Sequence, residues 1–506
     1  MAGCFIPLWA TPSRRIGTRC FCSICWPGSN LLLAICPGQP RLTPSSAEQQ
    51  NWLKALAEWL SSEPHMHQNA MKPTDRRQFL KRTATAVATM ALGAPQLSRA
   101  VGANDRVVLG MIGPGGHGAN LLRAFLAQPD VVVAWVCDPD AQRMDAASQT
   151  VQKLTGQAPK THKDMRRIFE DAAVDAVVIA TPDHWHGPAT LLACEAGKHV
   201  YVEKPCAHNL REGRLMVEAA RRYKRVVQVG TQSRSAPYVR QAMELLHQGA
   251  IGKVLVAKAW NGQLRRIIGR LQPSPPPPHL DFDLWLGPAP AVPYQANLLP
   301  GLWRWWRAFG TGDIGNDGVH ELDLAVWGLG VQTHLIRITG LGGNYFFDDD
   351  QQFPDTQYVT YEYAGADGQR RLLVYEQRIW SPYVQEGHEN GNAFYGTDGM
   401  LILGKATGWQ LFGPRNVLKQ KAEGRLDLGL HVRDFLDSIK TGRQPNADIF
   451  AGHLAAALAH LGNIATQLGR TLQFDPAAEQ IPGDAEANAL LGRTYRAGHW
   501  AVPKSV

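Results

Sequence analysis

The feature that most constrains this fold is a glycine-rich segment, residues 113–118, with the sequence GPGGHG. It follows an apolar, strand-like run at residues 106–112 and precedes a helical stretch at residues 119–127. Glycines between a strand and a helix let the backbone approach a pyrophosphate, whose negative charge then lies at the helix N-terminus. This order predicts a dinucleotide-binding turn.

Short, valine-rich apolar segments recur between residues 106 and 230, with helical stretches between them. They occupy residues 107–112, 131–137, 176–180, 199–202 and 226–230. This alternation is typical of a parallel sheet with crossover helices, because strands that are covered on both faces are continuously apolar. The predicted fold class is therefore α/β, with an N-terminal Rossmann dinucleotide-binding domain.

The pattern changes after Gly230. A helix is predicted at residues 236–246 and a strand at residues 254–261, followed by a loop with four consecutive prolines at 275–278. Alternating strands are predicted at residues 335–340, 357–363, 371–375, 392–396 and 400–403, and helices at 430–439 and 451–468. These elements predict a C-terminal α+β domain with an open, largely antiparallel sheet.

The first hundred residues differ in composition from the rest. They hold 11 Lys/Arg and 4 Asp/Glu, whereas the remaining residues hold 41 and 40. The nearly neutral body gives no reason to expect nucleic acid as a partner. Cys20, Cys22 and Cys25 have no suitably spaced His or Cys cluster to complete a metal site, so no metal is expected.

An export signal is predicted near residue 76. Arg76 and Arg77 precede a weakly apolar stretch at residues 83–94 that is too short to span a bilayer, and small residues near Ala100 suit cleavage. The pattern predicts a twin-arginine signal and a periplasmic protein, with no membrane association after export. Met71 begins a complete signal, so residues 1–70 are predicted to be a disordered, non-native upstream extension.

The expected division of the chain follows from these patterns. It comprises the extension (1–70), the signal (71–103), the Rossmann domain (104–231), a substrate and oligomerisation domain (232–430), C-terminal helices that return toward the Rossmann domain (431–475) and a tail (476–506).

Asp138 bears on the choice of cofactor. It ends the second predicted strand, twenty residues beyond Gly118. A carboxylate there accepts hydrogen bonds from the adenosine ribose hydroxyls and repels a 2′-phosphate, which favours NAD over NADP. The alternative is that Asp138 is a turn residue before Pro139.

Four further motifs carry a family resemblance: ATPDHWH at residues 180–186, VEKP at 202–205, QVGTQSRS at 228–235 and GDIGNDGVHELD at 312–323. With them the chain resembles the glucose–fructose oxidoreductase / inositol dehydrogenase / MocA (Gfo/Idh/MocA) family from about residue 105 to residue 474. The resemblance implies a nucleotide domain, a second domain whose open sheet often serves in oligomerisation, and NAD(P)-dependent chemistry on a sugar or cyclitol.

The resemblance and the glycine turn together give the candidate binding residues. Those expected to contact the cofactor are Gly113, Gly115, Gly116, His117, Gly118, Asp138, Thr181, Pro182, Asp183, His186, Glu203 and Lys204. Those expected to contact the substrate are Trp185, Arg234 and Asn316, although a structural ion pair is an equally good interpretation of Arg234. The pair His184 and His186 is not interpreted as a zinc site.

The candidate catalytic residues are Lys204, Asn316, Asp317 and His320. Many relatives have an acid four residues before this His, whereas here that position is Asn316 and the acid is Asp317. Either Asp317 substitutes through a shifted turn, or Asn316 binds a hydroxyl while Lys204 or His320 moves the proton. Because the ordinary pKa of His is about 6.5 and that of Lys is about 10.4, we expect His320 to be the group that titrates near neutrality, with Lys204 as a positioning cation.

Three functions are compatible with this sequence. The leading one is oxidation of a secondary alcohol of a sugar, glycoside or cyclitol, with tightly bound NAD. The second is an NAD-dependent glycoside hydrolase that works by oxidation, elimination, addition and reduction. The third is a non-catalytic sugar-binding protein. A small carbohydrate and further copies of the same chain, associated through the open sheet, are the expected partners.

Overall fold

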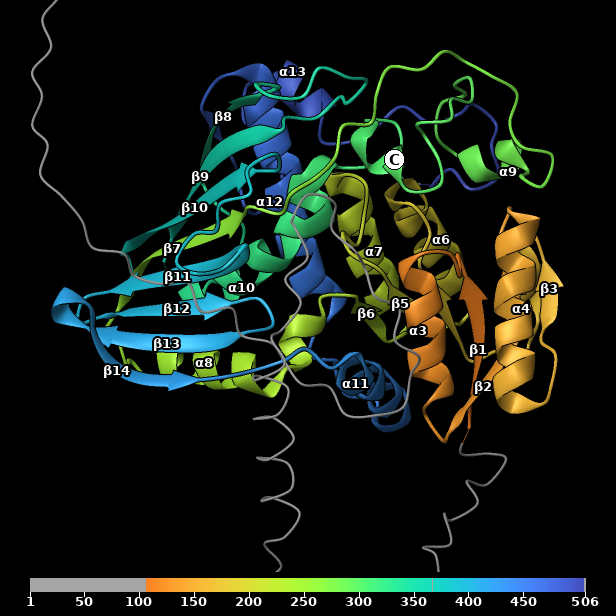
Figure 1. Cartoon of the computed structure of the whole chain (residues 1–506), viewed down its shortest axis with the longest axis horizontal. Coiled ribbons are helices and arrows are strands. Elements are labelled where there is room, and N and C mark those ends of the chain that lie inside the picture. Colours follow the sequence, from red (N-terminus) through yellow and green to blue (C-terminus); the bar gives the residue numbers. More distant parts are fainter. Residues whose placement is uncertain (1–105, 366, 505–506) are drawn as a thin grey trace, which may run out of the picture. The chain divides into compact units, whose positions relative to one another are not determined.

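The computed structural model describes residues 106–504 apart from residue 366 (Figure 1). The predicted upstream extension and export signal lie outside the described residues. The described part contains a six-stranded and a nine-stranded sheet.

The first sheet is entirely parallel, with the strand order β3-β2-β1-β4-β5-β6. Its strands are β1 (Val107–Ile112), β2 (Val131–Cys137), β3 (Lys160–His162), β4 (Ala176–Ile179), β5 (His199–Val202) and β6 (Val227–Val229). The order reverses at β1, because β2 and β4 flank it on opposite sides. This doubly wound arrangement confirms the predicted Rossmann domain.

Helices cover both faces of this sheet, which explains its continuously apolar strands. One face packs against α3 (His117–Leu126), α4 (Ala141–Thr155) and α11 (Leu428–Thr441). The other packs against α5 (Arg166–Glu170), α6 (Asp183–Glu195) and α7 (Leu210–Arg222). The C-terminal helix α11 thus packs against the sheet of the first domain.

The second sheet has the order β14-β13-β12-β11-β7-β10-β9-β8-β15 and is antiparallel except where β7 pairs with β10. Its strands are β7 (Val254–Asn261), β8 (Arg337–Gly343), β9 (Thr356–Ala364), β10 (Arg370–Arg378), β11 (Asn390–Gly396), β12 (Met400–Gly404), β13 (Gly408–Gly413), β14 (Val417–Ala422) and β15 (Leu472–Gln473). The predicted open, largely antiparallel sheet is confirmed. Strands β13, β14 and the short β15 were not predicted from the sequence.

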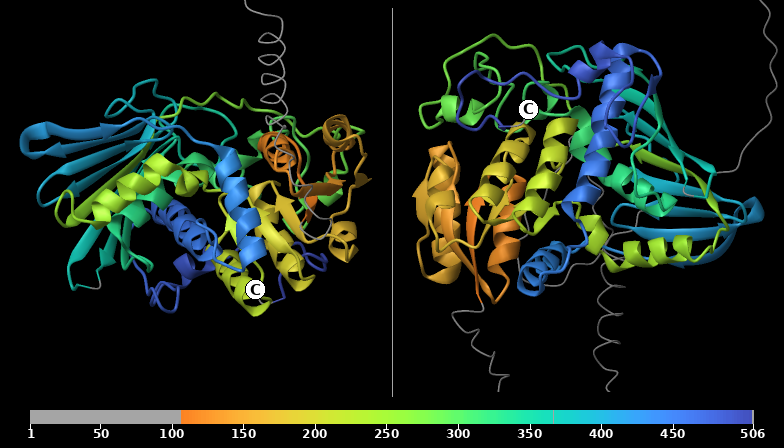
Figure 2. Two further views of the ribbon diagram at one scale, coloured as in Figure 1. Left: turned by 90° about the horizontal axis from the view of Figure 1, so that it is seen from below. Right: turned by 180° about the vertical axis from the view of Figure 1, so that it is seen from behind.

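Within residues 106–504, helices pack on one face of the second sheet and not on the other (Figure 2). They are α8 (Pro237–His247), α10 (Val319–Leu329) and α12 (Ile449–Leu468), whose apolar side chains share one core with the sheet. The alternation in β9 shows the two faces, since Val359 and Tyr361 are fully buried whereas Tyr358 is 44% exposed. The opposite face therefore presents side chains outward.

Helix α12 joins the two domains. Ile449 and Ala456 pack in the core of the first domain, and Leu461 and Ile464 pack in the core of the second. By length and apolar composition α12 is the one helix among the described residues that could cross a membrane, but 78% of its apolar window is buried inside the protein. It is therefore a core helix of this fold.

A long connection, residues 262–310, leaves β7 and crosses over the first domain; we call it the covering segment. It includes the four prolines and α9 (Phe282–Leu286). The amide of Asp281 donates to the Pro139 carbonyl at 2.9 Å, the amide of Ala141 donates to the His279 carbonyl at 2.9 Å, and Lys163 pairs with Asp281 at 2.6 Å. The covering segment is thereby held against the loop that follows β2.

The C-terminal residues also pack on the first domain, where the sequence suggested only a tail. Arg493 forms an ion pair with the fully buried Glu212 at 2.6 Å and donates to the His184 carbonyl at 2.7 Å. Tyr495 donates to the same Glu212 carboxylate at 2.7 Å. The last described residues therefore fix α6 and α7 in position.

Candidate active site

A cavity of about 760 Å³ lies at the carboxyl ends of β1, β2, β4 and β5. This is the edge where parallel α/β sheets bind ligands, next to the strand at which the order reverses. The covering segment closes it from the opposite side, with Leu284, Trp285 and Tyr294 among its lining residues. Predicted residues that line the cavity are Gly113, Gly115, Gly116, His117, Asp138, Thr181, Pro182, Asp183, Trp185, His186, Glu203, Lys204 and Asn316.

The glycine turn requires its glycines. Gly113 has φ +77° and Gly116 has φ +51°, backbone conformations that side chains strongly disfavour. A Cβ atom at Gly118 would lie 2.1 Å from the Gly113 carbonyl oxygen, and one at Gly113 would lie 2.7 Å from the Ala180 carbonyl oxygen. The turn therefore packs closely against the start of α3. Its backbone along the cavity is not covered by side chains, so that a pyrophosphate can approach it.

Asp138 lies at the end of β2, where the sequence placed a ribose contact. Its Oδ1 accepts a hydrogen bond from the Asp140 amide at 2.9 Å. Burial raises the pKa of Asp138 to about 7, against hydrogen bonding from Asp140 and the charge of Arg143. A buried carboxyl with spare acceptor capacity at this place fits the two hydroxyls of an adenosine ribose. The residues present therefore fit a dinucleotide.

Residues 180–182 connect β4 to α6, and residues 183–186 form the first turn of α6. The two ring nitrogens of His186 lie 2.9 Å from the Thr181 carbonyl oxygen and 2.7 Å from the Pro205 carbonyl oxygen, which ties the loop after β4 to the loop after β5. The Asp183 carboxylate accepts from the Thr311 hydroxyl at 2.8 Å. Trp185 is almost fully buried and donates to the Trp285 carbonyl at 3.0 Å, so it forms a wall beneath the covering segment.

The end of β5 places Glu203 and Lys204 side by side. Glu203 is buried and lies 3.5 Å from the ring of His117, and a hydrogen bond to Glu203 raises the pKa of His117. Lys204 extends across the cavity, where its Nζ donates to the backbone carbonyl of Asn316 at 2.5 Å. Burial lowers the pKa of Lys204, although the charges of Glu203, Asp317 and Asp183 act in the opposite direction.

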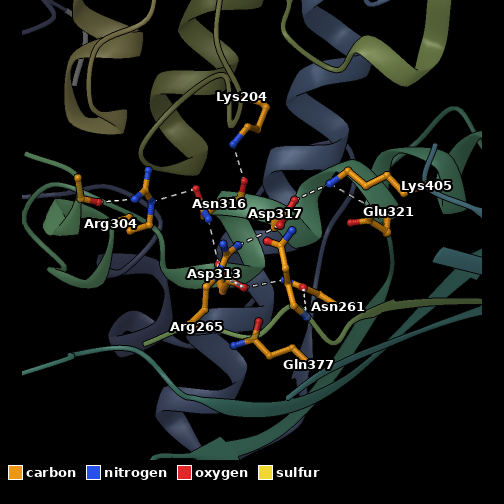
Figure 3. Close-up of polar contacts among 12 residues, drawn as sticks. Lys204, Asn261, Arg265, Arg304, Asp313, Asn316, Asp317, Glu321, Gln377 and Lys405 are labelled. Carbon is orange, nitrogen blue, oxygen red and sulfur yellow. Dashed lines mark hydrogen bonds and ion pairs between the residues drawn. The ribbon is translucent and has the colours of Figure 1, made fainter. Parts of the chain in front are cut away.

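Asn316 and Asp317 lie in a π-helical turn, Ile314–Gly318, that leads into α10 (Figure 3). Such turns often occur at functional sites, because the extra residue changes which side chains face a common partner. Asn316 lines the cavity; its Oδ1 accepts from Arg304 Nε and its Nδ2 donates to Asp313 Oδ1, each at 3.0 Å. Of the two alternatives in the sequence, the geometry therefore favours Asn316 as the cavity-lining residue.

Asp317 instead belongs to an ion-pair cluster behind the cavity wall. It pairs with Arg265 at 2.9 Å and with Lys405 at 2.5 Å. Burial alone would raise the pKa of Asp317, but the charges of Lys405, His320 and Arg265 lower it well below its usual range. A carboxylate held in this way is a weak proton acceptor.

His320 is buried on α10, and its Nδ1 has no hydrogen-bond partner among the described residues. Burial, followed by the charges of Lys405 and Lys204, lowers the pKa of His320 well below its ordinary value, while Asp317 acts in the opposite direction. The ring is therefore neutral near pH 7. His320 is not among the residues that line the cavity.

Arg234 forms a structural ion pair, which was the alternative to a substrate contact. Its guanidinium pairs with the buried Asp323 at 2.8 Å and stacks over the ring of Trp327, 4.9 Å from the centroid. It does not line the cavity. Its contacts hold the start of α8 against α10.

Three charged residues around the π-helical turn could not be predicted from the sequence. Arg265 and Arg304 come from the covering segment, and Lys405 follows β12. None of them belongs to a recognisable motif, and only the fold brings them together. Their basic charge was the only available signal, and it does not distinguish them from exposed arginines and lysines.

Two family models match the chain. A model described as "Oxidoreductase family, NAD-binding Rossmann fold" matches residues 107–231, and one described as "Oxidoreductase family, C-terminal alpha/beta domain" matches residues 257–502. The first confirms the predicted NAD-binding domain. The second covers the sheet domain and the C-terminal helices.

Several curated relatives share sequence with the chain. A "Glycosyl hydrolase family 109 protein" of Saccharopolyspora erythraea is 32% identical over 184 residues, which are 35% of this chain and 40% of that protein. The "Levoglucosan dehydrogenase" of Pseudarthrobacter phenanthrenivorans is 38% identical over 92 residues, or 18% of this chain and 24% of that one. The "scyllo-inositol 2-dehydrogenase (NAD(+))" of Bacillus subtilis is 27% identical over 57% of this chain and 70% of that protein. The chain thus spans less than half the length of the first two relatives.

Solved structures share the fold over most of the described chain. A levoglucosan dehydrogenase in complex with NADH and levoglucosan superposes with a TM-score of 0.58 at 18% identity, covering 73% of this chain and 99% of that one. The aldose-aldose oxidoreductase from Caulobacter crescentus, complexed with glycerol, gives a TM-score of 0.57 at 17% identity, covering 73% and 100%. With both family models matched in order along the sequence, the chain belongs to the Gfo/Idh/MocA oxidoreductase family.

Proposed function

We propose that the protein oxidises a secondary alcohol of a sugar, glycoside or cyclitol, with NAD that stays bound between turnovers. The observation that carries this proposal is the continuous cavity that runs from the glycine turn and Asp138 to Lys204 and Asn316. It combines groups that suit a dinucleotide with an amine and an amide that suit a hydroxyl. Relatives that act on levoglucosan and on scyllo-inositol support the substrate class.

The reaction removes a proton from the hydroxyl and a hydride from its carbon. NAD⁺, when bound, supplies the hydride acceptor. We assign the proton transfer to Lys204, because its Nζ lies in the cavity and its pKa is lowered by burial, both of which suit a general base. Asn316 would hold the same hydroxyl through its amide, which Arg304 and Asp313 keep in one orientation.

This assignment differs from the expectation that His320 titrates. Burial lowers the pKa of both groups. It makes Lys204 a better base, whereas it favours the neutral ring of His320, so that His320 does not titrate near neutral pH.

The covering segment supports retention of the cofactor. It closes the cavity over the end that holds Asp138, through backbone contacts on both sides of Pro139 and the ion pair of Lys163 with Asp281. Exchange of a bound dinucleotide would require this segment to separate from the first domain. Retention also suits an exported enzyme, which has no external pool of NAD.

The relationship to the glycosyl hydrolase family 109 protein favours a second candidate, the glycoside hydrolase. In that reaction a sugar carbon is oxidised, the neighbouring C–H is deprotonated, the aglycone is eliminated, water adds and the carbon is reduced again. The same cavity serves both functions. A released aglycone without a net change in sugar oxidation state would identify the hydrolase.

The location and the assembly are proposed on separate grounds. The arginine pair at residues 76 and 77 supports export by the twin-arginine pathway to the periplasm. The face of the second sheet on which no helix of the described residues packs supports a homo-oligomer, since Tyr358 and Leu372 are exposed on adjacent strands of that face.

Replacement of Lys204 tests the function. We expect Lys204→Ala to keep its bound nucleotide but to lose at least about a hundredfold in rate, the scale of a lost acid–base group. The assay is reduction of the bound NAD by a panel of sugars, methyl glycosides and inositols, followed by absorbance in a single turnover. Nucleotide is measured after denaturation, and Lys153→Ala on the exposed side of α4 is the control. Unchanged rates in Lys204→Ala would refute the assignment, and bound NAD that no compound of the panel reduces in the wild type would indicate a sugar-binding protein. An activity loss at low pH that survives in Lys204→Ala and vanishes in His320→Ala would assign the base to His320.

The pKa of Asp138 predicts how nucleotide binding depends on pH. The ribose hydroxyls need an ionised acceptor, and this carboxyl is ionised only above its raised pKa of about 7. We expect the affinity of the nucleotide-free protein for NAD, measured calorimetrically, to be constant above that pH and to fall below it by up to about tenfold per pH unit. Asp138→Asn should bind more weakly, without this pH dependence and with less preference over NADP. The same dependence in Asp138→Asn would contradict the role of Asp138.

The open sheet predicts the oligomeric state. We expect Tyr358→Glu combined with Leu372→Glu to dissociate the assembly, because two charges would be buried in the interface without partners. Sedimentation velocity measures the result, and Leu154→Glu provides the control, since Leu154 is 59% exposed on the first domain. An unchanged sedimentation coefficient in the double variant would show that the protein does not associate through this face.

Export can be tested with the signal alone. Residues 71–103 fused to a folded reporter should carry it across the inner membrane, and replacement of Arg76 and Arg77 by lysine should block that transport. Cell fractionation measures the distribution of the reporter. Normal export of the lysine variant would contradict the proposed pathway.

A further inference from the structure

Two cations line the cavity near the proposed reacting hydroxyl, Lys204 and Arg304. Neither forms an ion pair with a carboxylate among residues 106–504 for which contacts are described. Lys204 donates to a backbone carbonyl, and Arg304 donates from Nε to the neutral amide of Asn316 at 3.0 Å and from Nη1 to the Gly301 carbonyl. Their positive charges are therefore not neutralised by direct contacts.

By contrast, the charged residues behind the cavity wall form ion pairs with one another. Arg265 pairs with Asp313 and Asp317, each at 2.9 Å, and Lys405 pairs with Asp317 (Figure 3). Glu321 is close to Lys405, but burial raises the pKa of Glu321 to about 8, so its carboxyl is mostly protonated near pH 7. This cluster therefore has no negative charge to spare for Lys204 and Arg304.

Two further acids lie near this end of the cavity, Asp183 and Glu203. Asp183 accepts a hydrogen bond from Thr311, and burial raises its pKa. Glu203 lies next to Lys204 and 3.5 Å from the His117 ring, so its negative charge acts on those two residues, and Arg304 is left without a carboxylate contact. A bound NAD⁺ brings a further positive charge on its nicotinamide ring, so a neutral sugar would leave an excess of positive charge in a desolvated site.

Arg304 is oriented to meet an anion. Its bonds to Asn316 and Gly301 and its position 5.0 Å from the centroid of the Trp303 ring fix the plane of the guanidinium. A guanidinium has five N–H donors, so donors remain for a ligand. A carboxylate matches this planar group best, because two parallel hydrogen bonds can form.

We propose that the substrate is a sugar acid, whose carboxylate binds Arg304 while the hydroxyl to be oxidised lies beside Lys204. This inference rests on the proposed function and narrows its substrate class from sugars in general to uronic and related acids. The carboxylate would give the Arg304 guanidinium an anionic partner, which it lacks among residues 106–504 for which contacts are described. Arg304 thus determines substrate specificity, and Lys204 remains the residue that moves the proton.

Matched pairs of sugars test the proposal. The probes are D-glucose and D-glucuronate, D-galactose and D-galacturonate, and D-mannose and D-mannuronate, with D-glucose 6-phosphate as a second kind of anion. Binding to the NAD-loaded protein is measured by calorimetry and reduction of bound NAD by absorbance. We expect the acid of at least one pair to bind at least about tenfold more tightly than its neutral partner, the scale of a charge-assisted hydrogen bond.

Variants assign that preference to Arg304. Arg304→Gln should remove the preference for the acid while the content of bound NAD stays unchanged, and Arg304→Lys should retain part of it because the charge is kept. Arg307→Gln is the matched control: Arg307 lies on the same covering segment, but it is exposed and does not line the cavity. Circular dichroism establishes that each variant is folded.

The outcomes separate this inference from the proposed function. Turnover without a preference for acids, tighter binding of the phosphate, a preference that persists in Arg304→Gln, or no binding of any acid overturns the inference. Failure of every sugar to reduce NAD, together with Arg304-dependent binding of a uronate, overturns the proposed oxidation but supports the sugar-acid site.

Discussion

The hydrogen bond from the Lys204 ammonium to the Asn316 carbonyl connects the two halves of the site. Lys204 ends a strand of the first sheet, and Asn316 lies in the π-helical turn that opens onto the second. A short contact between these places requires the two domains to keep one relative position. Helix α12, which packs in both cores, supplies that rigidity at a distance from the cavity. The reacting end of the cavity is thus positioned by domain packing and not by a flexible loop.

Electrostatics decides what this rigid frame can do. Buried charges are tolerated only when paired or hydrogen-bonded, and the cluster of Arg265, Lys405, Asp313 and Asp317 meets that condition without any ligand. It keeps Asp317 ionised and ion-paired on both sides. Asp317, which the sequence suggested as a candidate base, is therefore not free to accept a proton. The same cluster leaves the carbonyl and amide of Asn316 as neutral partners for Lys204 and Arg304. A change from an acid to an amide at this position therefore shifts the wall of the cavity toward positive charge.

The sequence predicted the elements with regular patterns and missed those without. Strands β1, β2, β4 and β5 are buried on both faces and read as apolar runs, whereas β3 is the polar edge strand Lys160–His162 and β14 exposes nearly all its residues. The glycine turn and the motifs at residues 180–186 and 202–205 lie together along the cavity because short loops fix them to strand ends. Arg304 and Arg265 could not be found, since they come from a proline-containing connection whose path depends on what it packs against. The role of Arg234 could not be predicted from the sequence either, because only the fold shows that it pairs with Asp323.

Retention of the cofactor places a chemical condition on any reaction in this cavity. A nicotinamide that does not leave must return to its starting oxidation state at the same site before the next turnover. Net oxidation of one molecule therefore requires that a second molecule be reduced in the same cavity, as a ping-pong sequence. Hydrolysis through oxidation and reduction of one sugar meets the condition without a second reductant or oxidant. Both reactions need a proton acceptor and a hydroxyl-binding group, the roles that we propose for Lys204 and Asn316, so one geometry is compatible with two outcomes. Which outcome occurs depends on whether the substrate carries a leaving group next to an acidified C–H bond.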